Sequence, residues 1–238
     1  MISSKSLIVE FDRRFDRFAS EYKKNLRIED KVSVLNEAQD KVFENLVSIC
    51  ETNSEVRNDL RPFEIKDKNL KIKKTSKDYT IVEIPEELYK ILRMKVKAKK
   101  PNCGSKEIPV TIFQTDDLEW ALKDEYWQPS YTWENVLGDE GSEGFYLYHN
   151  NDFQVERCTI DYYRKPKKLE AASMSPDQKG YEDANGEFIY YDQDCEFDRT
   201  FKWHTIVDLA VLIARNDIGD NRDFSLNLNK ILNKEKIT

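Results

Sequence analysis

Residues Tyr79–Ala98, YTIVEIPEELYKILRMKVKA, decide the fold class of this 238-residue chain. The β-branched run that opens this stretch stops at Pro85, which is typical of a strand that ends at a turn. Because proline suits the first position of a helix, Pro85–Leu88 predicts a short helical turn. From Ile91 to Ala98 apolar residues alternate with basic ones, which indicates a strand with one solvated face. The centre of the chain is therefore expected to form antiparallel sheet.

Further strand signals lie on both sides of this stretch. Short β-type runs occur at Phe63–Ile65, Leu70–Ile72, Ile108–Phe113, Phe145–Tyr148 and Phe153–Tyr163. Asn150-Asn151 predicts a hairpin between the last two runs, and Asn185-Gly186 predicts a second hairpin between Tyr181 and Phe188. Between these runs, Thr115 is a good N-cap for a short helix that ends near Asp124.

Helical periodicity marks both ends of the chain. One apolar stripe runs from Leu7 to Tyr22, a second from about Glu29 to Cys50, and a third from about Thr200 to Asn216. The short connection between the first two predicts an αα-hairpin. We therefore expect an α+β fold, in which this hairpin packs with the C-terminal helix. The helical bundle is expected to comprise 1–53 and 199–238, and the inserted antiparallel β-rich region with long loops to span 54–198.

The net charge of −7 conceals alternating basic and acidic blocks. Val56–Lys106 holds 15 basic and 7 acidic residues, whereas Gln114–Phe145 holds 1 basic and 9 acidic, and Asp177–Asp198 holds 1 basic and 8 acidic. An acidic chain is not expected to bind nucleic acid generally, because neutralising phosphate needs a basic surface. The blocks are either solvated faces or complementary surfaces that pair between neighbouring subunits.

Catalytic and metal-binding motifs are scarce. The four cysteines form no C-x-x-C motif and are expected to be reduced thiols, and no secretory or membrane-spanning segment is expected. His204 and Asp208 lie four residues apart on a predicted helix, which favours a surface pair over a catalytic one, since no nucleophile accompanies them. Gly138–Gly144 carries three carboxylates and no lysine, so we expect a mobile surface loop rather than a phosphate-binding one. We expect no catalytic residue, no metal site and no cofactor.

Two segments carry candidate contact residues. In a strand, the alternating carboxylates that begin with Asp192 and Asp194 would line one face, which suits a solvated edge or a charged contact surface better than a cation site. The aromatic segment from Tyr126 to Trp133 includes Tyr131, and alternation there does not tell whether Tyr131 or Trp133 is buried. These aromatics are either core residues or interface anchors.

Five stretches resemble structural proteins of crAss-like bacteriophages that form rings of the head–tail connector. They are VEFDRRFDRF at 9–18, VSVLNEAQDKVFENL at 32–46, VEIPEELYKIL at 82–92, TIDYYRKPKKL at 159–169 and WHTIVDLAVLIAR at 203–215. The chain departs from the family pattern in the acidic Gly138–Gly144 loop, in the acidic run before the last helix, and in lacking a Pro-Glu start to that helix.

The resemblance implies a structural virion protein, made in the host cytoplasm, that forms a ring layer below the portal. Its implied partners are copies of itself, by family resemblance twelve, together with the portal protein and adjacent ring or tail proteins. Genomic DNA would pass through the channel without specific binding. Closed rings need head-to-tail contacts, in which one surface complements another on the same chain. The candidate contact residues are Arg164, Lys165, Lys167, Lys168, Tyr131, Trp133, Asp192 and Asp194.

Two other functions stay open at this point. A phage scaffold or assembly-chaperone module would share the lack of catalytic motifs but would not form a ring. A metal-dependent hydrolase would use Asp192, Asp194 and Glu196, and would lose divalent-ion binding on Asp194→Ala.

Overall fold

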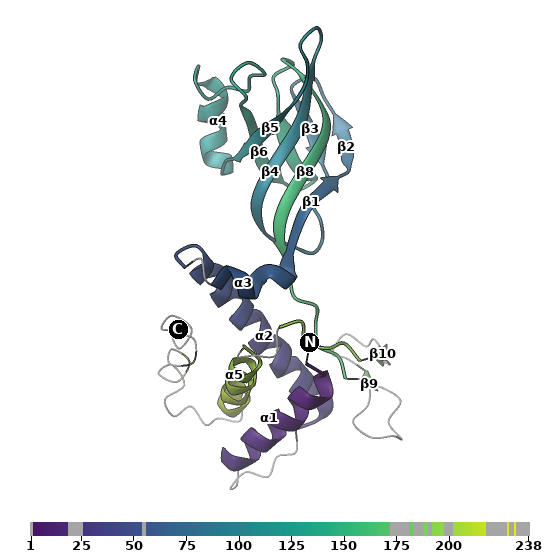
Figure 1. Cartoon of the computed structure of the whole chain (residues 1–238), viewed down its shortest axis with the longest axis vertical. Helices are drawn as coiled ribbons and strands as arrows, with labels where there is room; N and C mark the ends of the chain where they lie inside the picture. The colour runs from purple at the N-terminus through teal and green to yellow at the C-terminus, as the bar shows by residue number, and fades with distance from the viewer. Residues whose placement is uncertain are drawn as a thin grey trace. The chain divides into compact units, whose positions relative to one another are not determined.

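The computed structural model describes residues 2–18, 26–53, 56–171, 181–182, 188–189, 192–197 and 202–217, together with positions 228 and 231 (Figure 1). The chain divides into two compact units, each described here by itself. The helical unit comprises Met1–Pro62 and Pro166–Thr238, and the sheet unit comprises Phe63–Lys165. The fold class is mixed α+β, as the sequence predicts.

The helical unit is built on three long helices: α1 (Ser4–Phe18), α2 (Ile28–Cys50) and α5 (Lys202–Asp217). A short helix, α3 (Arg57–Leu60), follows α2 and continues into a 3-10 turn, η2 (Arg61–Phe63). Both α1 and α2 pack mainly against α5. From Ile206 to Ala214 every residue of α5 except Asp208 is buried, which is typical of a helix at the centre of a core.

The segment 166–171 belongs to the helical unit, although the sequence placed it in the β-rich insertion. The side chain of Asn36 on α2 makes two hydrogen bonds with the backbone of Leu169. It accepts from the Leu169 N–H at 2.7 Å and donates to the Leu169 carbonyl at 3.1 Å. The amide of Gln39 donates to the carbonyl of Lys167 at 2.9 Å. Such contacts between side chain and backbone leave no periodic pattern in the sequence. The β-rich region therefore ends at Lys165 in the structure rather than at residue 198, as the sequence predicts.

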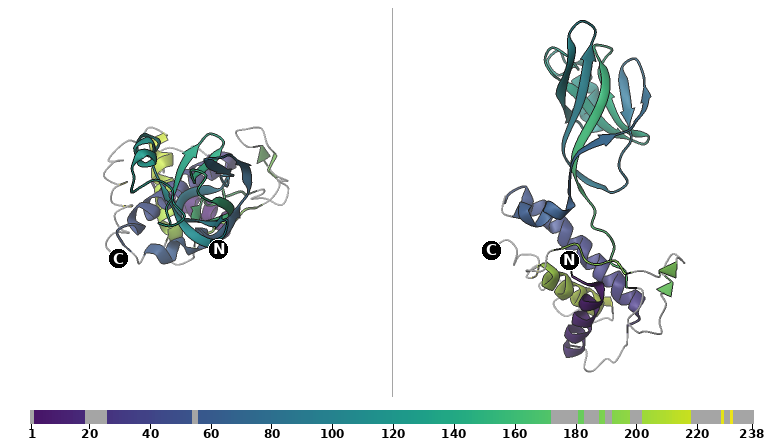
Figure 2. Two further views of the ribbon diagram at one scale, coloured as in Figure 1. Left: turned by 90° about the horizontal axis from the view of Figure 1, so that it is seen from above. Right: turned by 45° about the vertical axis from the view of Figure 1, so that its right-hand side comes forward.

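The sheet unit contains one eight-stranded sheet in the order β1-β8-β4-β5-β6-β7-β3-β2. Its strands are β1 (Glu64–Leu70), β2 (Ile72–Thr75), β3 (Tyr79–Val82), β4 (Leu88–Lys100), β5 (Gly104–Ile112), β6 (Val136–Gly141), β7 (Gly144–Tyr148) and β8 (Gln154–Arg164). The two edge strands, β1 and β2, are joined by Lys71 alone, so the sheet must curl until its edges approach each other. Figures 1 and 2 show the strands wrapping around a common interior.

All strand pairs in this sheet are antiparallel except β5 and β6, which run parallel. A parallel pair needs a crossover, and the helix α4 (Thr115–Lys123) supplies it. Side chains alternate across β6, so Val136 faces the enclosed core while Leu137 packs against Leu118 and Ala121 of α4. The helix therefore covers part of the outer face of the sheet.

Several local expectations are confirmed and others are wrong. β9 (Tyr181–Glu182) pairs antiparallel with β10 (Phe188–Ile189), as the hairpin signal at Asn185-Gly186 predicts, although that dipeptide lies outside the described residues. The hairpin predicted around Asn150-Asn151 is wrong, because β7 pairs with β3 and β6, whereas β8 pairs with β1 and β4.

The Gly138–Gly144 stretch is a β-hairpin, so the expectation of a loop there is wrong. Gly141 pairs with Gly144 across a two-residue turn between β6 and β7. Gly144 has a φ of +149°, and a Cβ there would lie 2.1 Å from the carbonyl oxygen of Val82 on β3. Glycine is required because two strands approach too closely for a side chain. The Pro85–Leu88 segment likewise forms a turn that leads directly into β4 rather than a helical turn.

A candidate protein-interaction surface

Four large aromatic side chains on one short segment of the sheet unit project into solvent. The exposed fractions are 59% for Trp120, 90% for Tyr126, 42% for Trp127 and 83% for Trp133. We call these four residues the exposed aromatics. Trp120 lies on α4, and the other three lie on the 124–135 connection between α4 and β6. Tryptophan and tyrosine dominate the energetics of protein interfaces, so this segment is the strongest candidate for a contact site.

The first half of the 124–135 connection is held by hydrogen bonds from side chain to backbone. A carboxylate oxygen of Asp124 accepts from the N–H groups of Tyr126 at 2.8 Å and Trp127 at 3.2 Å. The side-chain amide of Asn135 donates to the carbonyl of Trp127 and, at 3.3 Å, to that of Gln128. The Trp127 ring also packs edge-on against Phe113, with centroids 5.7 Å apart.

The second half of the connection is closed by its own backbone. Ser130 and Asn135 exchange two N–H···O bonds of 2.9 and 3.0 Å, which enclose a tight turn. Glu134 occupies left-handed backbone space at φ +55° within this turn, and its carboxylate pairs with Lys106 at 3.0 Å. Trp133 lies at the tip of the turn. Because the backbone is fixed before a partner arrives, binding through this segment costs less conformational entropy than binding through a loose loop.

Tyr131 is the aromatic residue of this segment that anchors it to the sheet unit. It is 7% exposed, its hydroxyl donates to the carbonyls of Cys103 and Gly104 at 3.3 and 3.2 Å, and its N–H donates to Asp152 at 2.7 Å. Its placement as a contact residue is therefore corrected, because the ring lies in the core. Trp133, by contrast, is on the surface. The sequence did not single out Trp120, because helical spacing alone does not tell which face of α4 is buried.

The basic face of β4 is neutralised within the sheet unit. Lysines of this strand pair with acids on the neighbouring strands, Lys97 and Lys99 with Glu156 at 3.4 and 3.2 Å, and Lys95 with Glu107 at 3.7 Å. Arg93 pairs with Asp161 at 2.6 Å. Burial acts to raise the pKa of Asp161, but hydrogen bonds from the Asp67 N–H and the Arg93 guanidinium hold it below its usual value. The positive block between Val56 and Lys106 is consequently only in part available to a partner.

The four basic residues predicted at the end of β8 are divided between the two units. Arg164 and Lys165 belong to the sheet unit, where the Arg164 guanidinium lies 5.7 Å from the centre of the Phe63 ring and the Lys165 N–H donates to the backbone carbonyl of Glu87 at 2.9 Å. Lys167 and Lys168 belong to the helical unit, and both side chains are exposed. The Lys167 N–H donates to Glu196 at 2.9 Å.

Asp192 and Asp194 do not lie on a regular strand, and their side chains contact the first residues of α1. The carboxylate of Asp194 accepts from the N–H of Ser4 at 3.1 Å, and Asp192 pairs with Lys5 at 3.0 Å. A carboxylate at a helix N-terminus satisfies an unpaired N–H and favours the helix dipole. Within the described residues, no group of three or more potential metal ligands comes together.

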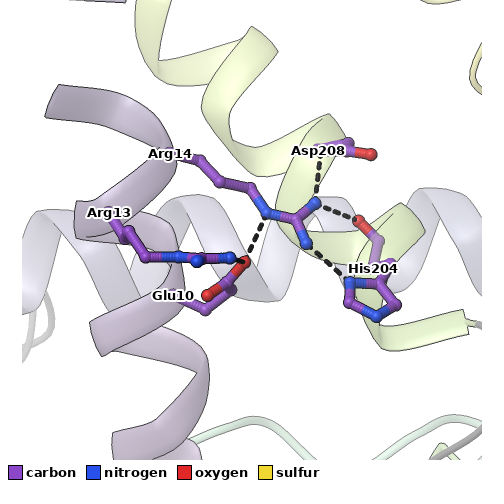
Figure 3. Close-up of polar contacts among 5 residues, drawn as sticks. All are labelled: Glu10, Arg13, Arg14, His204 and Asp208. Atoms are coloured by element: carbon purple, nitrogen blue, oxygen red, sulfur yellow. Dashed lines mark hydrogen bonds and ion pairs between the residues drawn. The ribbon is translucent and has the colours of Figure 1, made fainter. Parts of the chain in front are cut away.

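His204 and Asp208 form part of a polar cluster between α1 and α5, drawn in Figure 3. The Arg14 guanidinium bonds the carboxylate of Asp208, the Nδ1 atom of His204 at 2.6 Å and the Glu10 carboxylate at 2.8 Å. Because a guanidinium only donates, Nδ1 must accept, so its lone pair is occupied. Hydrogen bonds from Arg13 and Arg14 lower the pKa of Glu10 to about 2, against the effect of burial.

Comparison with known proteins provides no further assignment. No protein-family model matches the chain, and a search of curated proteins finds no significant match. No helix of the described residues combines the length and hydrophobicity needed to cross a membrane.

Proposed function

We propose that this chain is a structural assembly protein of a bacteriophage virion, a ring subunit of the head–tail connector or tail barrel below the portal. The observation that carries the proposal is the set of exposed aromatics on a hydrogen-bonded connection. Rigid aromatic side chains supply large contact areas at low entropic cost, which suits permanent contacts between subunits. The resemblance of five sequence stretches to ring proteins of crAss-like phages supports the same role.

The proposal includes the following partners. Copies of the chain contact one another around the ring, and the portal protein and adjacent ring or tail proteins contact its two ends. DNA passes through the channel during ejection without specific binding, as the net charge of −7 favours. The antiparallel arrangement of the two N-terminal helices, packed with α5, is retained as part of this proposal. Catalysis and a cofactor have no role in it.

Electron microscopy of the purified chain, alone and mixed with the portal protein encoded in the same genome, tests the proposal. The expected result is rings with an axial channel, either spontaneously or on the portal. A chain that stays monomeric and does not bind the portal would contradict the ring role. The scaffold or assembly-chaperone function would then be the better account, since it needs a binding surface but no ring.

A further inference from the structure

Trp133 projects from the tip of a tight turn whose ends are Ser130 and Asn135. Its ring is 83% exposed, and its N–H donates to the hydroxyl of Ser130 at 3.4 Å. Because so little of the ring touches the protein, the backbone of the turn determines where the ring lies. A residue that fixes this backbone therefore controls how Trp133 is presented to a partner.

The residue that follows Trp133 has an unfavourable backbone conformation. Glu134 has a φ of +55°, in the left-handed region that glycine adopts freely and that costs free energy for a residue with a Cβ atom. A glycine at this position would remove the cost, so folding stability alone does not favour glutamate there. Backbone strain of this kind is concentrated at functional sites, where surrounding contacts hold it in place.

Lys106 holds the carboxylate of Glu134 in place. Its Nζ atom lies 3.0 Å from the Oε1 atom of Glu134 and 4.4 Å from the centre of the Tyr131 ring. Lys106 belongs to the regular part of β5, where it lies opposite Ala98 of β4. One ammonium group thus links the sheet and the buried Tyr131 ring to the residue next to Trp133.

The ion pair between Lys106 and Glu134 has a small role in folding. The Glu134 side chain is 57% exposed, and an ion pair open to solvent contributes little to stability. Folding stability therefore explains neither the backbone conformation of Glu134 nor its ion pair. Both of these features, however, restrict the turn that carries Trp133.

We infer that Lys106 and Glu134 are positioning residues for Trp133, because their ion pair ties the tip of the turn to β5 and so fixes the backbone beside the ring. Ordering Trp133 before contact lowers the entropy cost of binding through it. This inference rests on the proposed function, since Trp133 needs to be positioned only if the exposed aromatics form a contact.

Three variants of the full chain test the role of the ion pair in assembly. Lys106→Met removes the charge but keeps an unbranched side chain over Tyr131, and Glu134→Gly removes the carboxylate. Each should raise the concentration needed for assembly by about 3- to 10-fold, the ordering cost of one side chain. Lys106→Arg keeps the ion pair and should assemble like the unmodified chain. Native mass spectrometry, in the mixture in which the unmodified chain assembles, measures all of these species.

An ion pair of the helical unit provides the matched control. Lys41 on α2 pairs with Glu37, and both side chains are partly exposed, as in the pair at Trp133. Lys41→Met makes the same chemical change as Lys106→Met, and we expect it to leave assembly unchanged.

The Trp133→Ala background separates positioning from a general effect on the chain. Removing Trp133 alone should weaken assembly more strongly than Lys106→Met does, because an interface anchor is lost. Adding Lys106→Met to Trp133→Ala should then cause no further loss, since the ring that the pair positions is gone. A loss of the same size in both backgrounds would overturn the inference.

Two measurements on the monomer distinguish positioning from folding. The urea midpoint of Glu134→Gly should equal or exceed that of the unmodified chain, because the backbone cost at this residue is removed. With 5-fluorotryptophan incorporated, the fluorine signal of Trp133 is assigned by its absence in Trp133→Ala. It should become narrower in Lys106→Met, because the ring moves more freely. A lower urea midpoint, or an unchanged signal, would overturn the inference.

The assembly results also separate the inference from the proposed function. If the unmodified chain assembles, and Lys106→Met and Glu134→Gly assemble equally well, the inference fails while the proposed ring stands. If the unmodified chain never assembles, even with the portal protein, the proposed function fails and the inference fails with it.

Discussion

The helical unit and the sheet unit differ in where they place the side chains that attract attention in the sequence. In the helical unit the charged residues that attract attention in the sequence, such as Asp194 and His204, bond the unit to itself. In the sheet unit a hydrogen-bonded connection holds Trp133 and its neighbours out in solvent. The comparison teaches that charge patterning in the sequence does not by itself mark a free surface, because such charges can bond the unit to itself, whereas exposed aromatics on a fixed backbone are typical of interface anchors.

The largest expected effect is on folding stability and comes from Tyr131, the buried aromatic residue of the 124–135 connection. Tyr131→Ala removes a buried ring and its hydroxyl bonds, so it should lower the free energy of unfolding by about 3–5 kcal/mol. Urea unfolding, followed by circular dichroism, measures the change. A loss below about 1 kcal/mol would mean that Tyr131 is not the anchor of the connection.

The next effect concerns the polar cluster between α1 and α5. Arg14→Ala should lower the free energy of unfolding by about 1.5–3 kcal/mol, because four acceptor atoms on Glu10, His204 and Asp208 lose a charged donor. Arg13 provides a matched control, since it also bonds Glu10 but is exposed, and Arg13→Ala should leave the unfolding midpoint unchanged. Equal losses for the two variants would show that the links from Arg14 to α5 do not stabilise the unit.

The pH dependence of stability provides a smaller effect, located in the sheet unit. Burial lowers the pKa of His149 from its ordinary value of 6.5, although the Asp78 charge acts in the opposite direction. Its Nδ1 is buried without a hydrogen-bond partner among the described residues, and its Nε2 lies 3.2 Å from the Thr80 hydroxyl. The unfolded chain therefore binds a proton more readily than the folded chain.

The contribution of His149 to folding stability should accordingly be fully present above pH 6.5 and be lost as the pH falls below that value. Melting temperatures of the unmodified chain and of His149→Gln, measured between pH 7.5 and 5, test this expectation. The slope over this range should be shallower in the variant. Identical slopes would assign the pH dependence to other groups.

Removing two of the exposed aromatics is expected to have the smallest effect on folding stability. Tyr126→Ala/Trp133→Ala should change the free energy of unfolding by no more than about 0.5 kcal/mol, because neither ring is buried. Chemical denaturation of a monomeric sample measures it. A loss as large as that of Tyr131→Ala would place these rings in the core and remove them from the comparison.

Local structure was largely predictable from the sequence, and strand pairing was not. The stripe that predicts a helix at about Glu29–Cys50 corresponds to α2 at Ile28–Cys50, because helical periodicity is a property of neighbouring residues. By contrast, Asn150 and Asn151 do adopt left-handed backbone angles, yet the strands on either side join different partners. Pairing partners depend on the closure of the whole sheet, which no short stretch records.

The candidate surface was predictable only in part, for a similar reason. Residues Tyr126–Trp133 stand out in the sequence as an aromatic segment. Whether Tyr131 or Trp133 is buried depends on the carbonyls of Cys103 and Gly104, which come from a distant part of the chain.

The central claim is that the exposed aromatics build the contact between copies in a ring. Mass photometry of the unmodified chain and of Tyr126→Ala/Trp133→Ala, each with the portal protein, tests it most directly, with Val9→Ala as a control for an exposed apolar residue of the helical unit. The account predicts ring-sized particles for the unmodified chain and the control, and monomers or portal alone for the double variant. Ring-sized particles in all three samples would contradict it.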